Sequence, residues 1–273
     1  MGFSYEIRSR YYSKSFIFLS PLQQLLNEKL KLYYQPSFIA KDPIVVPHRF
    51  SKKQDIEIAG FFAAILAWGN RTTIINNANK LMRWMNDAPH DFILHHQPQD
   101  LKPFQHFAHR TFNATDALYF IHFLQQHYQQ HSSLETAFVG DGVYKHEHVK
   151  QALIHFHNYF FSLEEYPERT KKHIATPAKN SACKRLNMFL RWMVRSEEQG
   201  VDFGLWKRIK SHQLICPLDV HVASVAHRLG LLPHAKADWK NAELLTARLK
   251  EFNAEDPVLY DFALFGIGMA ERL

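Results

Sequence analysis

One apolar segment, KQDIEIAGFFAAILAWGNR at residues 53–71, restricts the possible folds of this chain more than any other feature. From Ile58 to Trp68 it is apolar on almost every side of a helix, and Gly69 then ends the pattern. A helix that is apolar all round belongs in the middle of a core and not on its surface. We therefore expect this helix at the centre of the protein.

Most of the remaining chain also has helical periodicity. Glycine is scarce, at 10 of 273 residues, which favours helices over hairpins. Thr72 or Thr73 can cap the helix that follows Gly69, whereas residues 42–50 (DPIVVPHRF) are bracketed by prolines and indicate an extended connector. Further helices are predicted at residues 21–34, 113–131, 146–163, 184–200, 241–253 and 257–269. The predicted fold class is all-α.

Charge and cysteine content narrow the functional classes. The net charge is +7 and the pI is about 9.3, as expected of a protein that binds a polyanion such as a nucleic acid. Two cysteines, Cys183 and Cys216, cannot form a four-cysteine iron–sulfur or zinc site. Residues 1–16 lack the apolar core of a signal sequence, and no apolar run approaches membrane-spanning length. We expect a cytoplasmic protein without membrane association.

The segment CPLDVHVASVAHRLGLL, residues 216–232, runs from apolar residues through a proline into Asp219 and then into a patterned helix. Asp219 is predicted to be the N-cap of that helix, a position where aspartate is common for structural reasons alone. Because the residues before Asp219 are apolar, we expect this cap to lie toward the interior of the protein. A carboxylate held there suits the stabilisation of a developing cation, so the sequence leaves both roles open.

The helix predicted from residue 184 has a polar stripe formed by Lys184, Asn187, Arg191 and Arg195, which we interpret mainly as a solvated face. Lys184 differs because it lies beside the helix N-terminus, where the dipole disfavours its charged form. A neutral lysine amine can attack an electrophilic sugar carbon.

A polar turn, Asn70-Arg71-Thr72-Thr73, joins the central helix to the next one. Such turns usually only connect helices. An amide side chain on a rigid turn can also fill the gap left by a base that leaves a duplex stack.

Three of these segments, in this order, resemble the helix-hairpin-helix DNA glycosylase superfamily. In that resemblance, PLDVHVASVAHRLGL places Asp219 as the catalytic aspartate, ILAWGNR places Asn70 as the residue that enters the stack, and SACKRLNMFLRWM places Lys184 as the catalytic lysine. DPVLYDFALFGIGM resembles the penultimate helix, with Asp261 near the site. The whole chain also resembles an uncharacterised bacterial protein family that has the blocks KRLNMFLRWMVR and PLDVH.

The chain departs from the superfamily pattern before Lys184. The segment TPAKNSACK contains no glycine, although the family hairpin uses glycines to grip a phosphate, and Lys184 and Asp219 are 35 residues apart. In both the altered hairpin and the long interval between lysine and aspartate, the chain resembles archaeal 8-oxoguanine glycosylases. The iron–sulfur cysteines of the endonuclease III branch are absent, so no cluster and no other cofactor is expected.

The resemblance implies a monomeric base-excision glycosylase, with a lyase step, acting on damaged double-stranded DNA. An 8-oxoguanine-like purine is the predicted lesion. Two helical lobes would flank a cleft, one formed by residues 53–200 and the other by residues 1–52 with 201–273. The implied catalytic residues are Lys184 and Asp219. The expected DNA contacts are Asn70, Arg71, Lys179, Ser181, Arg191 and His221, and the expected base pocket is Trp68, Phe189, Trp192 and Asp261.

Two other functions remain open. A protein that keeps the scaffold but only binds nucleic acid would explain the missing glycines. A metal-dependent hydrolase is suggested by 18 histidines, including HFAH at 106–109 and HEH at 146–148. No HExxH motif or carboxylate cluster accompanies them, so no metal site is predicted.

Overall fold

The computed structural model describes residues 19–196 and 199–270, and this part of the chain is all-α, as predicted. Residues 1–16, which gave the expectation of no signal sequence, lie outside it, as do the first 18 residues of the predicted second lobe. Over the described ranges, none of the helices combines the length and apolar character needed to cross a membrane.

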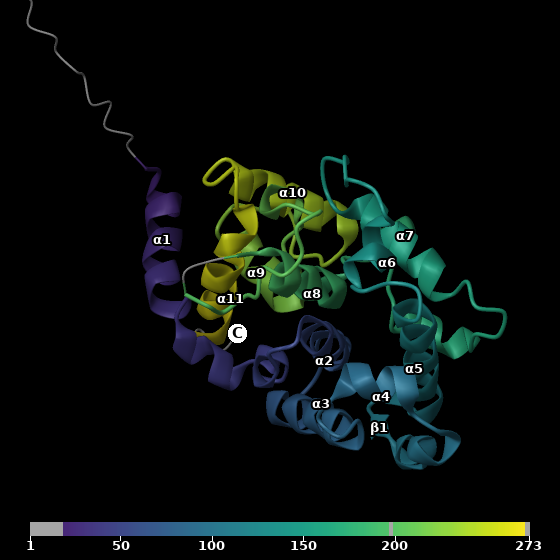
Figure 1. Cartoon of the computed structure of the whole chain (residues 1–273). Helices are drawn as coiled ribbons and strands as arrows, with labels where there is room; N and C mark the ends of the chain where they lie inside the picture. Colours follow the sequence, from purple (N-terminus) through teal and green to yellow (C-terminus); the bar gives the residue numbers. More distant parts are fainter. Residues whose placement is uncertain (1–18, 197–198, 271–273) are drawn as a thin grey trace, which may run out of the picture.

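Helices follow one another along the chain, and a two-residue antiparallel pair, β1 (Ala108–His109) with β2 (Phe112–Asn113), interrupts them once within the described ranges (Figure 1). The α-helices are α1 (Pro21–Tyr33), α2 (Lys53–Leu66), α3 (Arg71–Trp84), α4 (Pro89–His95), α5 (Ala114–Tyr128), α6 (Glu135–Val139), α7 (Lys150–Phe160), α8 (Lys184–Val194), α9 (Val220–Arg228), α10 (Trp239–Lys250) and α11 (Asp261–Ala270).

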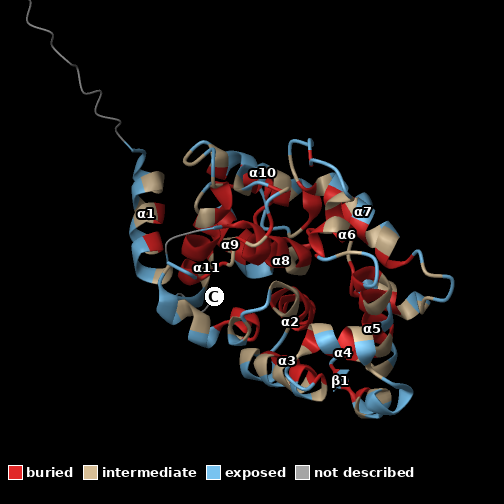
Figure 2. Ribbon diagram, in the orientation of Figure 1, coloured by how far each residue is buried: buried red, intermediate tan, exposed pale blue. Residues whose placement is uncertain are grey.

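Helix α2 is the central helix, which confirms the expectation from its apolar pattern. Every residue from Ile56 to Leu66 is buried, and α2 packs against α3 and α4 on one side and α8 on the other (Figures 1 and 2). The helix ends at Leu66, two residues before Trp68, and the chain then turns through Gly69, whose φ is +102°. The polar turn therefore begins where the core helix ends.

The cap predicted for α3 is wrong. Asn70, rather than Thr72 or Thr73, is the N-cap, and its Oδ1 accepts the backbone N–H of Thr73 at 3.1 Å. Asparagine is among the best N-cap residues because its short amide reaches the unpaired N–H groups of the first turn.

The extended connector predicted at residues 42–50 is also wrong. It forms two short 3-10 helices, Pro43–Val45 and Pro47–Arg49, each begun by a proline. Proline fixes φ at a helical value, and the Asp42 side chain caps the first of these turns by accepting the N–H of Ile44 at 3.1 Å. The prolines therefore start turns here instead of extending the chain.

Close packing of α11 brings the two ends of the described chain together. Helix α11 lies beside α1 and α9 (Figure 1). A Cβ on Gly266 would lie only 2.0 Å from the ring of Tyr33, so α1 can approach α11 only because this residue is glycine. This contact holds α11 against α1.

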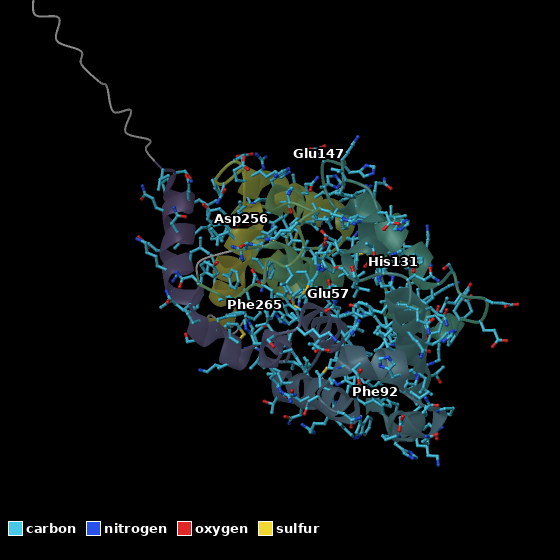
Figure 3. All side chains as sticks on the ribbon, viewed as in Figure 1. Glu57, Phe92, His131, Glu147, Asp256 and Phe265 are labelled. Carbon is cyan, nitrogen blue, oxygen red and sulfur yellow. The ribbon has the colours of Figure 1, made fainter. Side chains whose placement is uncertain are left out.

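A buried carboxylate, Glu57, joins α2 to segments far along the chain, and it lies near the middle of the molecule (Figure 3). Its oxygens accept hydrogen bonds from Tyr128, Ser133, Leu134 N–H and the indole of Trp206, at 2.6–3.1 Å. Burial raises the pKa of Glu57, and the hydrogen bonds from Ser133, Leu134 and Trp206 oppose that effect. Four satisfied donors make this carboxylate a structural centre of the fold.

Replacing Glu57 by glutamine should lower the free energy of unfolding by about 3 kcal/mol, because an amide nitrogen would face buried donors. Chemical denaturation measures this loss. Glu251→Gln is the matched control, since Glu251 forms an exposed pair with Arg248 that should contribute less than about 1 kcal/mol. Equal losses in the two variants would contradict the role assigned to Glu57.

Candidate active site

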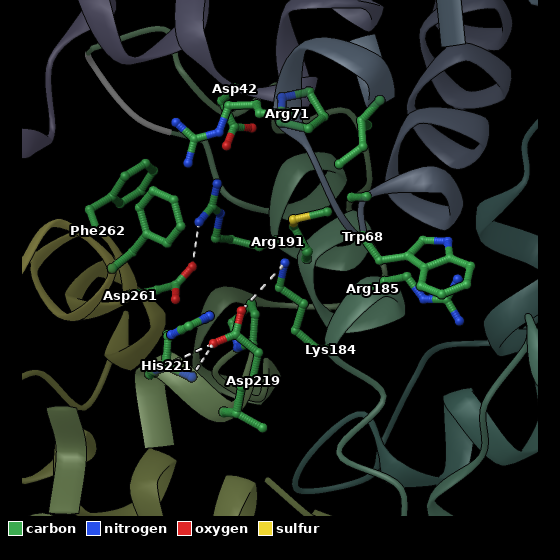
Figure 4. Close-up of a pocket in the computed structure, with 18 of the residues that line it drawn as sticks. Asp42, Trp68, Arg71, Lys184, Arg185, Arg191, Asp219, His221, Asp261 and Phe262 are labelled. Atoms are coloured by element: carbon green, nitrogen blue, oxygen red, sulfur yellow. Dashed lines mark hydrogen bonds and ion pairs between the residues drawn. The ribbon is translucent and has the colours of Figure 1, made fainter. Parts of the chain in front are cut away.

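A cavity of about 570 Å³ lies where α8, α9 and α11 meet the turn between α2 and α3 (Figure 4). Residues from both predicted lobes line it. The residues that line the cavity include Phe38, Asp42, Trp68, Arg71, Lys184, Arg185, Arg191, Asp219, His221, Asp261, Phe262 and Phe265.

Asp219 uses its two carboxylate oxygens for different purposes. It is the N-cap of α9, as predicted, and Oδ1 accepts the N–H groups of His221 and Val222, both at 3.0 Å. Oδ2 faces the cavity (Figure 4). The preceding residues 213–218 are all buried, so this cap is held at the cavity wall. Asp219 is thus both a helix cap and an available anion.

Lys184 lies opposite that anion. It is the first residue of α8, and its Nζ is 3.9 Å from Oδ2 of Asp219 (Figure 4). The two side chains are 27% and 31% exposed, so both can be reached from the cavity. Residues 35 positions apart in the sequence are therefore brought together as an amine–carboxylate pair at a ligand-sized cavity.

Arg191 and Arg195 are buried, which corrects their interpretation as part of a solvated face. Arg191 is 4% exposed, with its guanidinium 2.5 Å from Asp261 and 3.3 Å from Asp202. Arg195 is 1% exposed and pairs with Asp202 and with Asp256, the latter at 2.9 Å. Burial alone would lower the pKa of Arg191, but the two carboxylates raise it. Arg191 is therefore committed to Asp202 and Asp261 and is not available to contact DNA.

Asp42 is a cavity residue that sequence reasoning missed. It is 8% exposed, and burial raises the pKa of its carboxyl group against the opposing effects of the Ile44 N–H and Arg191. Its only sequence signal was its place before a proline, which indicated a connector and not a site. The cavity thus has a second buried acidic group opposite α9.

Aromatic rings form another wall of the cavity. Phe38 packs edge-on against Phe262 and Phe265, with ring centroids 5.2 and 6.0 Å apart. Trp68 lines the cavity as expected. Sequence reasoning missed the three phenylalanines because two of them lie in an apolar helix that reads as ordinary core, and Phe38 lies in a short polar segment.

The comparison with known families extends over most of this architecture. A family model described as "Protein of unknown function (DUF2400)" matches residues 42–270. The chain belongs to the DUF2400 family. No curated protein and no solved structure matches it. The span matched to DUF2400 begins at Asp42 and ends in α11, so it contains Lys184, Asp219 and Asp261.

Two residues expected in a base pocket lie elsewhere in this DUF2400 protein. Phe189 and Trp192 are fully buried in the core, where Phe189 contacts Phe61 and Trp206. Both lie on α8 beyond its first turn, and that part of the helix is enclosed by α2 and its neighbours. Because both rings are enclosed in the core, the prediction that they stack on a flipped base is wrong.

The other expected DNA contacts lie around the cavity mouth or on the adjoining surface of the DUF2400 fold. Arg71 and His221 line the cavity, and Asn70 is exposed on the turn beside it. Lys179 is exposed and Ser181 is half-buried in the segment before α8. These positions are compatible with the expected contacts, which stay predictions.

The glycine-free segment before Lys184 still has left-handed backbone. Asn180 and Cys183 have φ values of 54° and 49°, in the region that favours glycine. The carbonyl of Asn180 accepts the N–H of Trp239 at 3.1 Å, which anchors the segment to the start of α10. The chain thus reaches α8 through two tight turns without the flexibility of glycine.

Several histidines of the described ranges contact single polar partners. His109 contacts Asn77 at 2.9 Å, and His148 lies 3.4 Å from Glu243. Over residues 19–196 and 199–270, no group of three or more histidine, cysteine or acidic side chains is placed to hold a metal ion.

Arg191→Met should lower the free energy of unfolding by about 3–5 kcal/mol, because it leaves Asp261 buried without its cation. Thermal unfolding at neutral pH measures the effect. In the control Arg248→Met, the lost pair is exposed, and a change within about 0.5 kcal/mol is expected. An Arg191 variant as stable as this control would show that the buried network does not hold α8 and α11 together.

Proposed function

We propose that the cavity is the active site of a DNA glycosylase with an associated lyase step, as the sequence resemblance implies. The observation that carries the proposal is the 3.9 Å approach of Lys184 Nζ to Asp219 Oδ2 at an aromatic-walled cavity. A lysine nucleophile beside a fixed carboxylate is suited to attack at a sugar carbon that is becoming cationic.

The proposed steps use both groups of the pair. As the bond from C1′ to the damaged base breaks, its electrons leave with the base, and the Asp219 carboxylate stabilises the cationic sugar. The nitrogen lone pair of Lys184 Nζ then forms a bond to C1′. When the sugar ring opens, the electrons of the C1′–O4′ bond leave with O4′, which takes up a proton, and C1′ and Nζ are then joined as a Schiff base, from which strand cleavage follows. Asp219 is the nearby acceptor for the proton that Nζ gives up.

The position of the Asn70 turn supports a duplex substrate. Gly69 and Arg71 line the cavity on either side of the exposed Asn70, so a residue entering a base stack there would stand beside the space for the extruded base. The net charge of +7 favours a polyanion. On this proposal the predicted lobes lie on either side of the cleft, and a cytoplasmic monomer without a cofactor removes an 8-oxoguanine-like purine.

A second candidate is a nucleic-acid-binding protein without catalysis. The observation that favours it is the cap at α9, because Asp219 Oδ1 already satisfies two backbone N–H groups and so has a structural role. The two candidates differ in whether the negative charge of Asp219 is needed.

Asp219→Asn separates the cap from the charge, because asparagine caps a helix as well as aspartate does. We expect excision to fall by about 100-fold or more while unfolding and DNA binding stay nearly unchanged. Single-turnover assays on duplexes with 8-oxoguanine, uracil, oxidised pyrimidines or alkylated adenine measure this. Asp238→Asn, at the equivalent cap of α10, is the matched control and should keep full activity.

Each outcome of that assay decides between the candidates. Excision lost only in the Asp219 variant supports the glycosylase. No excision of any lesion by the wild-type protein, together with salt-sensitive binding of DNA, favours the binding protein. Excision that is equal in all three proteins would remove Asp219 from the chemistry.

A further inference from the structure

The indole of Trp68 is flanked by two guanidinium groups just outside the proposed active site. The guanidinium carbon of Arg110 lies 4.6 Å from the ring centroid, and that of Arg185 lies 5.9 Å from it. Arg110 is on the β1–β2 turn, with φ +57°, and Arg185 is in the first turn of α8 beside Trp68 (Figure 4). Three elements distant in sequence thus place two cations on one aromatic ring.

A smaller hollow of about 270 Å³ opens beside this ring. Its lining residues are Trp68, Thr111, Lys172, His173 and Arg185. Trp68 and Arg185 also line the cavity that contains Lys184, so the two spaces adjoin. A ligand that extends out of the larger cavity past Trp68 would meet Arg185 and Lys172.

These three cations are not neutralised by acidic side chains in the described part of the chain. Arg185 donates to the backbone carbonyls of Ile65, at 2.6 Å, and Lys172, at 3.4 Å. Arg110 and Lys172 are exposed, and neither forms an ion pair within the described ranges. By contrast, the neighbouring Arg169 pairs with Asp116 and Lys171 pairs with Glu168.

The half-buried member of the group, Arg185, supports the same conclusion. Burial lowers the pKa of Arg185 to about 10, so it remains charged at neutral pH while lacking a carboxylate partner. The nearby carboxylate of Asp116, behind His173, already accepts from Arg169 and Thr170. The hollow therefore presents positive charge that only an external anion would neutralise.

We propose that Arg110, Lys172 and Arg185, grouped around Trp68, bind a backbone phosphate of a nucleic-acid strand. Guanidinium and ammonium groups are the usual partners of phosphate oxygens, and the indole offers a face for an adjacent base. This site adds a DNA-binding element to the proposed function. Only the identification of the strand as part of a DNA duplex rests on the proposed function.

The position of Arg110 ties this site to the turn that carries Asn70. A Cβ on Gly69 would lie 2.9 Å from Nη1 of Arg110, so the guanidinium rests against the backbone next to Asn70. A strand held open at Asn70 would have its next phosphates within reach of the hollow. The site would add a phosphate contact next to the glycine-free segment before Lys184.

The experiment measures binding of a short fluorescein-labelled, undamaged duplex by anisotropy over a range of salt concentrations. All variants carry Asp219→Asn, so that catalysis plays no part. Arg110→Gln and Lys172→Gln should each weaken binding and reduce the slope of log K against log salt by about 1. The control Lys145→Gln removes an exposed lysine from the loop before α7 and should leave the slope unchanged.

Both variants replace exposed side chains, and thermal unfolding will confirm that they fold. Slopes equal to that of Lys145→Gln in both variants would overturn the phosphate site, even if the protein excises bases. Reduced slopes without excision of any lesion would support the phosphate site while the proposed enzyme activity fails. A larger effect on single-stranded DNA than on the duplex would overturn the assignment of the strand as part of a duplex.

Discussion

The buried ion network behind the cavity holds the candidate site together. Arg191 and Arg195 project from α8 to Asp202, Asp256 and Asp261, so one helix is tied both to the chain that follows it and to the start of α11. Buried charges are tolerated only when each is closely paired. Because α11 also packs on α9, the network positions α8 relative to α9. Lys184 is at the start of α8 and Asp219 is the cap of α9, so the network also positions these two groups.

The sequence predicted those features of the site that depend on neighbouring residues, and it missed those that depend on residues far apart in the chain. The cap at Asp219 and the central position of α2 follow from patterns within a few residues, and both predictions were confirmed. The partners of Arg191 lie 11 and 70 positions away in the sequence, so its polar position on the helix indicated a solvated side chain although the side chain is buried. The same limit hid Asp42, whose neighbours in the sequence describe only a turn.

The catalytic role proposed for Lys184 and Asp219 depends on both the sequence resemblance and the geometry of the cavity. The place of Lys184 at the start of a predicted helix and the resemblance together singled it out, and the fold places it 3.9 Å from Asp219. Membership of the DUF2400 family covers this pair but carries no activity with it. The glycosylase proposal therefore rests on the amine–carboxylate pair, the aromatic cavity and the excess of positive charge.

The most direct test of the central claim is to identify the residue that bonds to DNA. The wild-type protein would be mixed with a duplex that carries an excisable lesion or an abasic site, reduced with borohydride, digested and sequenced by mass spectrometry. We expect the sugar fragment on Nζ of Lys184, in the peptide that begins α8. A fragment on another lysine or on the N-terminal amine, or no adduct from any substrate, would contradict the assignment of this cavity as a lyase site.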